Sequence, residues 1–364
     1  MKREEALQHF MDECVVVHVN RLQAIVDRQF RQDKEVLLQP IIHAFEQLFA
    51  NISRQQQQGK LAPVAFIHLS LLRTSLLENK FTYLLEAYGE TWYFDWVECT
   101  AKYEAHWLCE AMRDLQNTLE KERKSYISIQ TTDVRVILQQ TVIQFHQYIV
   151  QLLRYLFRYH QESVPTINFQ RATCLRFRAG EYKGFSEDIA LIDERQQVEK
   201  DILLSLEKKE ANQSYTFENF SNLSLMQQDL SHMNFSYANF QDSNLAEASL
   251  HRSVCIGTNF IGCQLANVDF SYAMIQDADF RNANLAGVNF RHAQGKTLKF
   301  PNNEVPCYLG TDFSNANLQQ AKFEFAQMAG ANFTGANLKG ATFFQRDQAK
   351  YQFSQAQIKD IHWI

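Results

Sequence analysis

The sequence predicts a multidomain α+β protein: an α-helical domain over residues 1–164, a connecting region over 165–212, and a four-sided β-helix over 213–364. Two observations lead to this prediction. Up to about residue 164, apolar residues recur at spacings of three and four with almost no Gly or Pro, as in amphipathic helices. From about residue 213 they recur at every fifth position, a period that suits neither an α-helix nor a flat strand.

The N-terminal region divides into five segments with helical spacing, which are 3–30, 33–57, 62–77, 94–124 and 131–161. Pro40 lies inside the second segment and predicts a kink or a new helix start. The apolar run VAFIHLSLL at 64–72 is far shorter than the ~20 residues of a membrane span and predicts a buried helix. For residues 80–93 an alternative is a short hairpin that turns at Gly89.

The connecting region has a different pattern of apolar residues. The segment CLRFRAGEYKGFSEDIALI at 174–192 has alternating apolar residues and two glycines, which predicts short strands around a turn. A charged helix follows at about 193–210 and is placed to close the front end of the β-helix.

The pentad pattern can be counted. It begins at Phe220 and runs to Phe290, and a second run extends from Phe313 to Phe343, which together supply 22 apolar anchors. From Ala238 onward, the position two before each anchor holds a small or β-branched residue. If the chain bends once in each pentad, both positions point inward on every side, where they share a narrow, close-packed lumen. Four sides close one coil, so 22 anchors make 5.5 coils.

The pattern AxFxxANL, found at 278–285 and 331–338, resembles the pentapeptide-repeat family, whose repeat is A(D/N)LXX. This resemblance implies a right-handed quadrilateral β-helix over roughly 213–360. The ends of a repeat array must be covered. At the back end, two roles are open for four apolar residues, an end cap or a homodimer contact of the kind that some family members make. These residues are Phe353, Ile358, Ile361 and Trp363.

The segment RHAQGKTLKFPNNEVPCYLGTD at 291–312 interrupts the repeats. The spacing from Phe290 to Phe313 is not a multiple of five, so the extra residues must leave the coil as a loop. Loops that leave a regular scaffold often carry recognition, and the alternative is a tolerated insertion. The candidate contacts in this loop are Lys296, Lys299, Phe300 and Tyr308.

Composition and motifs favour a cytoplasmic protein that is not an enzyme. The net charge of −5 predicts no bulk attraction to nucleic acid or membrane, and the charged start MKREEALQHF lacks a signal segment. The sequence lacks the common catalytic motifs, so we expect no cofactor or metal. The spacing of Cys99, His106 and Cys109 could hold zinc on a helix face or reflect an ordinary core. The helix end Arg154–His160 could grip phosphate or simply suit the helix dipole.

Three functions follow from this organisation. The first is a non-catalytic scaffold that presents a rigid surface to a protein partner. The second comes from the resemblance: quinolone-resistance members imitate duplex DNA and bind DNA gyrase or topoisomerase IV, which also allows a role in self-immunity. The third makes the helical domain a ligand sensor and the β-helix its output module.

Charge along the repeats bears on the second function, because DNA mimicry needs a strip of negative charge. Residues 218–290 carry seven acidic and two basic side chains, a net charge of −5, whereas 291–364 carry eight basic and five acidic side chains, a net charge of +3. Six acidic residues are predicted to face outward and are candidate partner contacts. They are Asp229, Asp242, Glu247, Asp269, Asp277 and Asp279.

Overall fold

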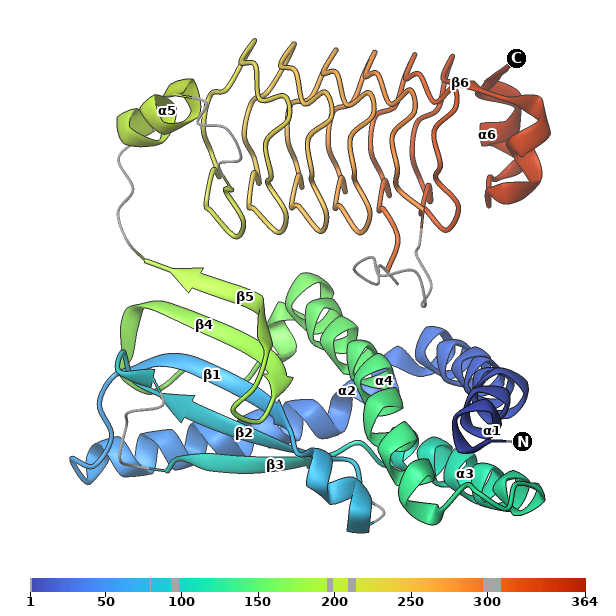
Figure 1. The fold of residues 1–364 in the computed structure, drawn as a ribbon. Coiled ribbons are helices and arrows are strands. Elements are labelled where there is room, and N and C mark those ends of the chain that lie inside the picture. Colours follow the sequence, from blue (N-terminus) through green and yellow to red (C-terminus); the bar gives the residue numbers. More distant parts are fainter. Residues whose placement is uncertain (1, 79, 93–97, 195–198, 209–213, 297–308) are drawn as a thin grey trace. The chain divides into compact units, whose positions relative to one another are not determined.

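The chain forms two compact units, residues 1–195 and 196–364. The computed structural model describes residues 2–364 except 79, 93–97, 195–198, 209–213 and 297–308 (Figure 1). The boundary lies later than the predicted one at 164, because the strands between 171 and 193 belong to the sheet of the N-terminal unit.

Four helices build the helical part of the N-terminal unit. They are α1 (Arg3–Phe10), α2 (Val16–Gln57), α3 (His106–Glu122) and α4 (Thr131–Tyr159), and a π-helical turn, Met11–Val15, joins the first two. Short 3₁₀ turns are Arg73–Glu78, Arg123–Ser125 and Gln161–Ser163. The break predicted at Pro40 is found at Asp33, whose backbone is non-helical (φ −116°, ψ 17°), and Pro40 lies inside the helix.

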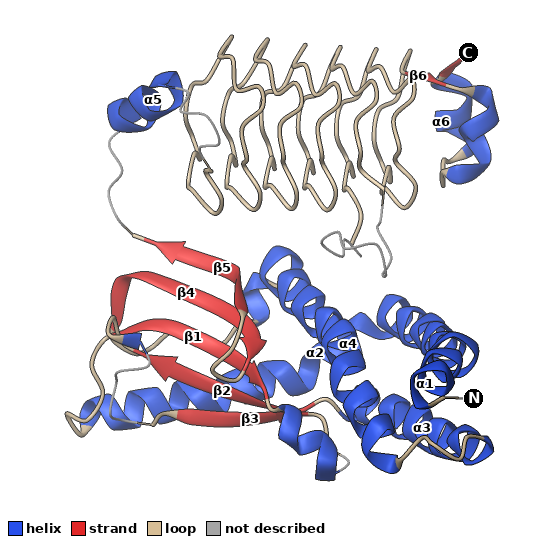
Figure 2. Cartoon of the chain, viewed as in Figure 1, coloured by secondary structure: helices blue, strands red, loops and turns tan. Residues whose placement is uncertain are grey.

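A five-stranded sheet completes this unit (Figure 2). Its strands are β1 (Val64–Leu71), β2 (Thr82–Tyr88), β3 (Thr100–Glu104), β4 (Arg171–Glu181) and β5 (Ser186–Asp193). The order is β3-β2-β1-β4-β5, in which β1 and β4 are parallel and the other neighbours antiparallel. The prediction of an all-helical 1–164 domain is therefore wrong between residues 64 and 104. The alternative hairpin over 80–93 has its first strand, β2, and its turn at Gly89 in the right place, but the partner strand is β3, which begins only at Thr100.

The apolar run at 64–72, which predicted a buried helix, forms strand β1 instead. In β1, Ile67 and Leu69 alternate with His68 and Ser70, yet all four residues are buried. When both faces of a strand are covered, the period of two is hidden, and a short apolar run cannot be told from a buried helix. The strands at 171–193, by contrast, were predicted in the right place.

The helices pack on the sheet through aromatic side chains. Phe177 of β4 contacts Phe45 of α2 and Phe157 of α4, with ring centroids 6.0 and 4.6 Å apart. Tyr83 of β2 shares a hydrogen bond of 3.1 Å with Nδ1 of His146 on α4. These contacts join one core between the helices and the sheet.

The C-terminal unit is the four-sided β-helix that the pentad period predicts (Figure 1). Parallel bridges join each position to the one four pentads later, such as Asn239 to Asn259 and Asn259 to Asp279, so four pentads make one coil. The second residue after each anchor has positive φ and turns the corner, as Asp242 does at 58°. Anchors one coil apart therefore lie directly above one another.

Two of the four columns of anchors in the lumen are uniform in residue type. On one face phenylalanine rings stack with centroids 4.7 to 5.2 Å apart, close to the spacing of adjacent strands. These are Phe220, Phe240, Phe260, Phe280, Phe313 and Phe333. The next face carries only leucine, namely Leu225, Leu245, Leu265, Leu285, Leu318 and Leu338. Matched side chains in register give a dry, close-packed interior.

The insertion is shorter than the predicted 291–312. The coil continues to Gly295, which occupies an anchor position, and Asp279 then bridges to Asp312, whereas an uninterrupted coil would bring position 299 beside it. The difference between these two positions, thirteen, is the length of the insertion. A Cβ on Gly295 would lie 2.6 Å from Sδ of Met328 and 2.7 Å from Oγ1 of Thr311, so only glycine fits where the chain leaves the coil.

Both ends of the β-helix are covered. At the front, α5 (Glu199–Lys208) places Leu206 in the core beside Tyr215. At the back lie β6 (Thr342–Phe343), a 3₁₀ turn (Gln345–Lys350), α6 (Gln355–Asp360) and β7 (His362–Trp363). The side-chain amide of Gln357 donates to the carbonyls of Phe333 and Ala336 at 2.7 and 3.0 Å, which satisfies acceptors of the last coil.

We expect Phe280→Ala to lower the free energy of unfolding of the β-helix by about 3–5 kcal/mol, because it opens a cavity inside the phenylalanine column. Met226→Ala, at an exposed outward position, is the matched control and should change stability by less than about 0.5 kcal/mol. Urea unfolding followed by circular dichroism measures both. Equal losses would contradict the stacked interior.

We also expect the N-terminal unit to lose stability in acid. Burial lowers the pKa values of His146 and His68 to about 4, below the ordinary 6.5. The unfolded chain then binds more protons between these values, so stability is full above about pH 6.5 and falls as the pH drops toward 4. Between pH 7 and pH 5 each histidine should cost about 2 kcal/mol.

Hydrogen exchange of α4 in urea at the two pH values measures this loss. His146→Phe should remove about half of the pH dependence, whatever its stability at pH 7. His43→Gln, on the exposed surface of α2, should leave the dependence unchanged. An unaltered slope in His146→Phe would show that His146 is not the titrating group.

Candidate functional site

At some corners of the β-helix, the residue type is not one that the local backbone conformation favours. Every corner residue has positive φ, a conformation that suits Gly, Asn and Asp and is unfavourable for bulky side chains. The corner after the phenylalanine column obeys this preference throughout. Its residues are Asn222, Asp242, Gly262, Asn282, Asn315 and Gly335.

At a different corner, each coil has a bulky residue in place of Gly, Asn or Asp. This corner carries five bulky side chains with φ between 56° and 62°, which we call the ring stripe: His232, Arg252, Tyr272, His292 and Phe325. Backbone strain of this kind persists only where something else holds the residue, and it concentrates at functional sites. The front of another corner has a shorter ring pair, Phe217 on Tyr237, which ends at Gly257.

Three rings of the ring stripe, those of Tyr272, His292 and Phe325, stack on the outside of the solenoid. The rings of Tyr272 and His292 are nearly parallel, with centroids 4.5 Å apart and planes at 6°. His292 and Phe325 follow at 4.8 Å and 4°. The guanidinium of Arg252 lies 5.7 Å from the ring centre of Tyr272. Tyr272 remains 48% and Phe325 54% exposed, so the column is ordered yet accessible.

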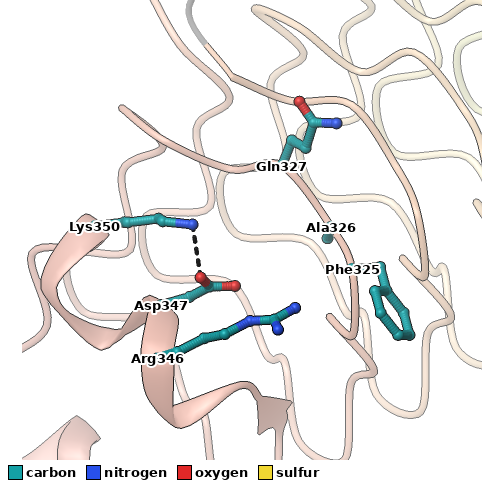
Figure 3. Close-up of a pocket in the computed structure, with 6 residues that line it drawn as sticks. All are labelled: Phe325, Ala326, Gln327, Arg346, Asp347 and Lys350. Carbon is teal, nitrogen blue, oxygen red and sulfur yellow. Dashed lines mark hydrogen bonds and ion pairs between the residues drawn. The ribbon is translucent and has the colours of Figure 1, made fainter.

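A pocket of about 430 Å³ lies at the back end of the ring stripe (Figure 3). In Figure 3 the side chain of Arg346 points toward the ring of Phe325, while Gln327 stands on the opposite side. We call it the end pocket, and it is lined by Phe325, Ala326, Gln327, Arg346, Asp347 and Lys350. Its volume is in the range of sites that hold a small molecule or an anchoring side chain.

Acidic groups around the stripe and pocket are already engaged. Glu324 is buried and accepts two hydrogen bonds from Arg291 at 2.8 and 3.0 Å. Burial alone raises the pKa of Glu324, but the hydrogen bonds and charge of Arg291 outweigh it and hold the pKa below its usual value. Asp347 pairs with Lys350 at 2.6 Å. Among the described residues, Arg252 and Arg346 contact rings and have no acidic partner.

The predicted outward placement of Asp277 and Asp279 is wrong. Asp277 is 5% and Asp279 2% exposed. Oδ1 of Asp277 accepts from the backbone N–H of Gly310 at 2.7 Å, where the chain rejoins the coil after the insertion. Asp279 is covered by Arg281, whose guanidinium donates to both carboxylate oxygens. Both acids therefore serve the fold.

The other four acidic candidates do not form a strip. Asp229 and Asp269 lie on one face, two coils apart, whereas Asp242 and Glu247 occupy two different corners. Asp269 accepts from Ser271 and Asn289 at 2.9 and 2.8 Å. The first half of the repeat region is acidic when its charges are summed along the sequence. In the closed coil of four pentads, these charges lie on different faces and corners.

The other predicted site residues belong to the insertion and to the C-terminal tail. Lys296 is half-buried at the start of the insertion, and Lys299, Phe300 and Tyr308 lie outside the described residues. Three of the four tail residues, Phe353, Ile361 and Trp363, pack in or against the core of the β-helix, and Ile358 contributes its backbone carbonyl. Phe353 contacts Phe333 at 5.2 Å, Trp363 donates from Nε1 to the carbonyl of Ile358 at 3.0 Å, and Ile361 is buried.

Two features of the N-terminal unit take structural roles. Cys99 precedes β3 and His106 begins α3, so the helical spacing that suggested zinc does not exist, and no group of three or more metal-ligating side chains gathers within the described residues. At the end of α4, Arg154 pairs with Glu187 at 2.7 Å and the hydroxyl of Tyr155 donates to Glu35 at 2.5 Å.

None of the helices in the described part of the chain is long and apolar enough to span a bilayer.

Sequence reasoning missed the ring stripe, although a signal was present. His232, Arg252, Tyr272 and His292 follow one another at intervals of four pentads, and sorting the repeats by coil rather than by pentad brings them into one column. Phe325 joins the column only after the insertion is subtracted, which requires the structure.

Comparison with known proteins identifies the repeat region. The family model for pentapeptide repeats matches eight copies at residues 229–263, 263–294 and 310–345. The C-terminal region is thus a pentapeptide-repeat domain, and the matched model describes a repeat rather than a catalytic domain. A search of curated proteins found no match to this chain.

Three solved structures illustrate the similarity. A pentapeptide repeat protein from the Arabidopsis thaliana thylakoid lumen is 21% identical over 40% of this chain and 70% of its own, with a TM-score of 0.21. Rfr23 from the cyanobacterium Cyanothece 51142 is 19% identical over 38% and 99%, with a TM-score of 0.22. Full-length QnrB1, a plasmid-mediated fluoroquinolone resistance protein, is 14% identical over 42% and 94%, with a TM-score of 0.18.

We expect Asp277→Ala to loosen the return of the chain to the coil, because the buried N–H of Gly310 loses its acceptor at a cost of about 1–3 kcal/mol. Hydrogen exchange at residues 310–313 should accelerate. Asp242→Ala, an exposed corner residue of the same repeat position, is the control and should leave exchange there unchanged. Identical exchange in both variants would contradict the anchoring role.

Proposed function

We propose that this chain is a non-catalytic binding protein whose pentapeptide-repeat domain holds a protein partner on the ring stripe and end pocket. The observation that carries the proposal is the run of five bulky side chains in a backbone conformation that disfavours them. Three of them, Tyr272, His292 and Phe325, are stacked, and Tyr272 and Phe325 are about half-exposed. A corner used only to turn the chain would do better with Gly or Asn.

The chemistry of the stripe suits recognition of a protein. Tyr and Arg are enriched among the residues that dominate binding energy, and the stripe presents Arg252, Tyr272 and Phe325 beside a pocket able to receive an anchoring side chain. Because the rings are held by stacking on consecutive coils, binding would order few additional side chains. Preorganisation of this kind increases affinity by reducing the entropy lost on association.

Topoisomerase binding by DNA mimicry ranks second. It requires a continuous negative strip, and the acidic side chains lie on different faces and corners, with Asp277 and Asp279 buried. The third function, a ligand sensor in the N-terminal unit with the β-helix as its output, stays a prediction, although that unit contains a five-stranded sheet and is not all-helical.

The proposal is tested by affinity purification from the native host with quantitative mass spectrometry. The bait is the full chain, compared with the stripe variant Tyr272→Ser/Phe325→Ser and a matched control, Asp242→Asn/Glu247→Gln, on other corners. We expect specific partners to fall at least tenfold with the stripe variant and to persist with the control.

A gyrase supercoiling assay, with and without a fluoroquinolone, forms the second arm. Inhibition or protection that survives the stripe variant and disappears in the control would favour the topoisomerase function and overturn the proposed one. Thermal unfolding by circular dichroism verifies that each variant is folded.

A further inference from the structure

We infer that the ring stripe and end pocket bind an extended acidic segment of the partner protein, with carboxylate groups placed on Arg252 and Arg346. This inference rests on the proposed function and adds the chemistry of what is bound.

Once the internal ion pairs are removed, positive charge remains at the two ends of the site. Glu324 is neutralised by Arg291, and Asp347 by Lys350. The guanidinium groups of Arg252 and Arg346 remain, each over a ring and neither with an acidic partner among the described residues. The adjoining face adds no further positive charge, because exposed Lys322 lies in the same column as Asp269 and Asp229. A partner that complements this surface must bring negative charge.

The rings themselves favour the same ligand. The rings of Tyr272, His292 and Phe325 are parallel and stacked along the solenoid axis. Each ring therefore covers a face of the next, and the exposed part is the ring edge. Aromatic edges carry the positive side of the quadrupole, and the Tyr hydroxyl and His nitrogen atoms add hydrogen-bonding groups. Carboxylate oxygens suit such a surface.

The same geometry argues against a stacking ligand such as a single-stranded nucleic acid. Bases bind to aromatic platforms through exposed ring faces. Here neighbouring rings are 4.5 and 4.8 Å apart, and a base inserted between them would need about twice that spacing. Adjacent coils are hydrogen-bonded to each other on every side, so the backbone cannot open by that amount.

The length of the site matches a short extended peptide. Arg252 and Arg346 are about four coils apart, and at the strand spacing this is roughly 19 Å. An extended chain of about six residues covers that distance. The end pocket, with Phe325 on one wall and Arg346 on another (Figure 3), would take a side chain at one end of the segment.

The test uses two fluorescein-labelled octapeptides, one alternating Glu and Tyr and the other Gln and Tyr. Fluorescence anisotropy with the full chain measures their affinities. We expect the acidic peptide to bind at least tenfold more tightly, and its affinity to fall with added salt, because the attraction is electrostatic. Arg252→Gln/Arg346→Gln should remove the preference, whereas Lys339→Gln, an exposed cation on another face, should preserve it.

Equal binding of the two peptides, or an unchanged preference in the double variant, would overturn the inference. So would tighter binding of a fluorescein-labelled single-stranded oligonucleotide of the same net charge. These failures are distinguishable from failure of the proposed function: if the stripe variant still loses its partners in affinity purification, the stripe is the binding site and only its assigned acidic ligand is wrong.

Discussion

The closed coil of four pentads is the constraint on which the C-terminal unit depends. Each pentad must turn one corner and send two side chains inward, and each coil must bond to the next at the strand spacing. Any residue is therefore stacked on its equivalent one coil away, inside as a column of Phe or Leu and outside as whatever the corner carries. An insertion is tolerated only if the chain returns in register, which the hydrogen bond between Asp277 and Gly310 secures.

The ring stripe is a consequence of the same stacking applied to the outer surface. A single exposed Tyr on a loop would be mobile, but Tyr272 lies between Arg252 and His292 and is held there by the coils. The backbone strain of five bulky residues at positive φ is offset in part by these ring contacts. The stripe thus combines exposure with rigidity, which is the combination that a binding surface needs.

The N-terminal unit depends on a core between helices and a sheet rather than on repeated coils. Its long helices pack one side of a mixed sheet through Phe45, Phe157 and Phe177, and its interior includes the neutral His146 bonded to Tyr83. Much of both faces of β1 is buried, so the polar residues His68 and Ser70 sit inside. Such a core is stable only while its polar groups keep their partners and stay uncharged.

By itself, the sequence determined the β-helix and its inward residues, because a pentad period admits one backbone and every anchor repeats it. It also placed the long helices and the strands at 171–193, where the periodicity is unambiguous. It could not determine β1, β2 and β3, since an apolar run covered on both faces has no visible period. The surface was decided only by the tertiary structure. Which outward residues become neighbours depends on closing the coil and subtracting the insertion, and that closure scattered the acidic residues, buried Asp277 and Asp279, and assembled the ring stripe.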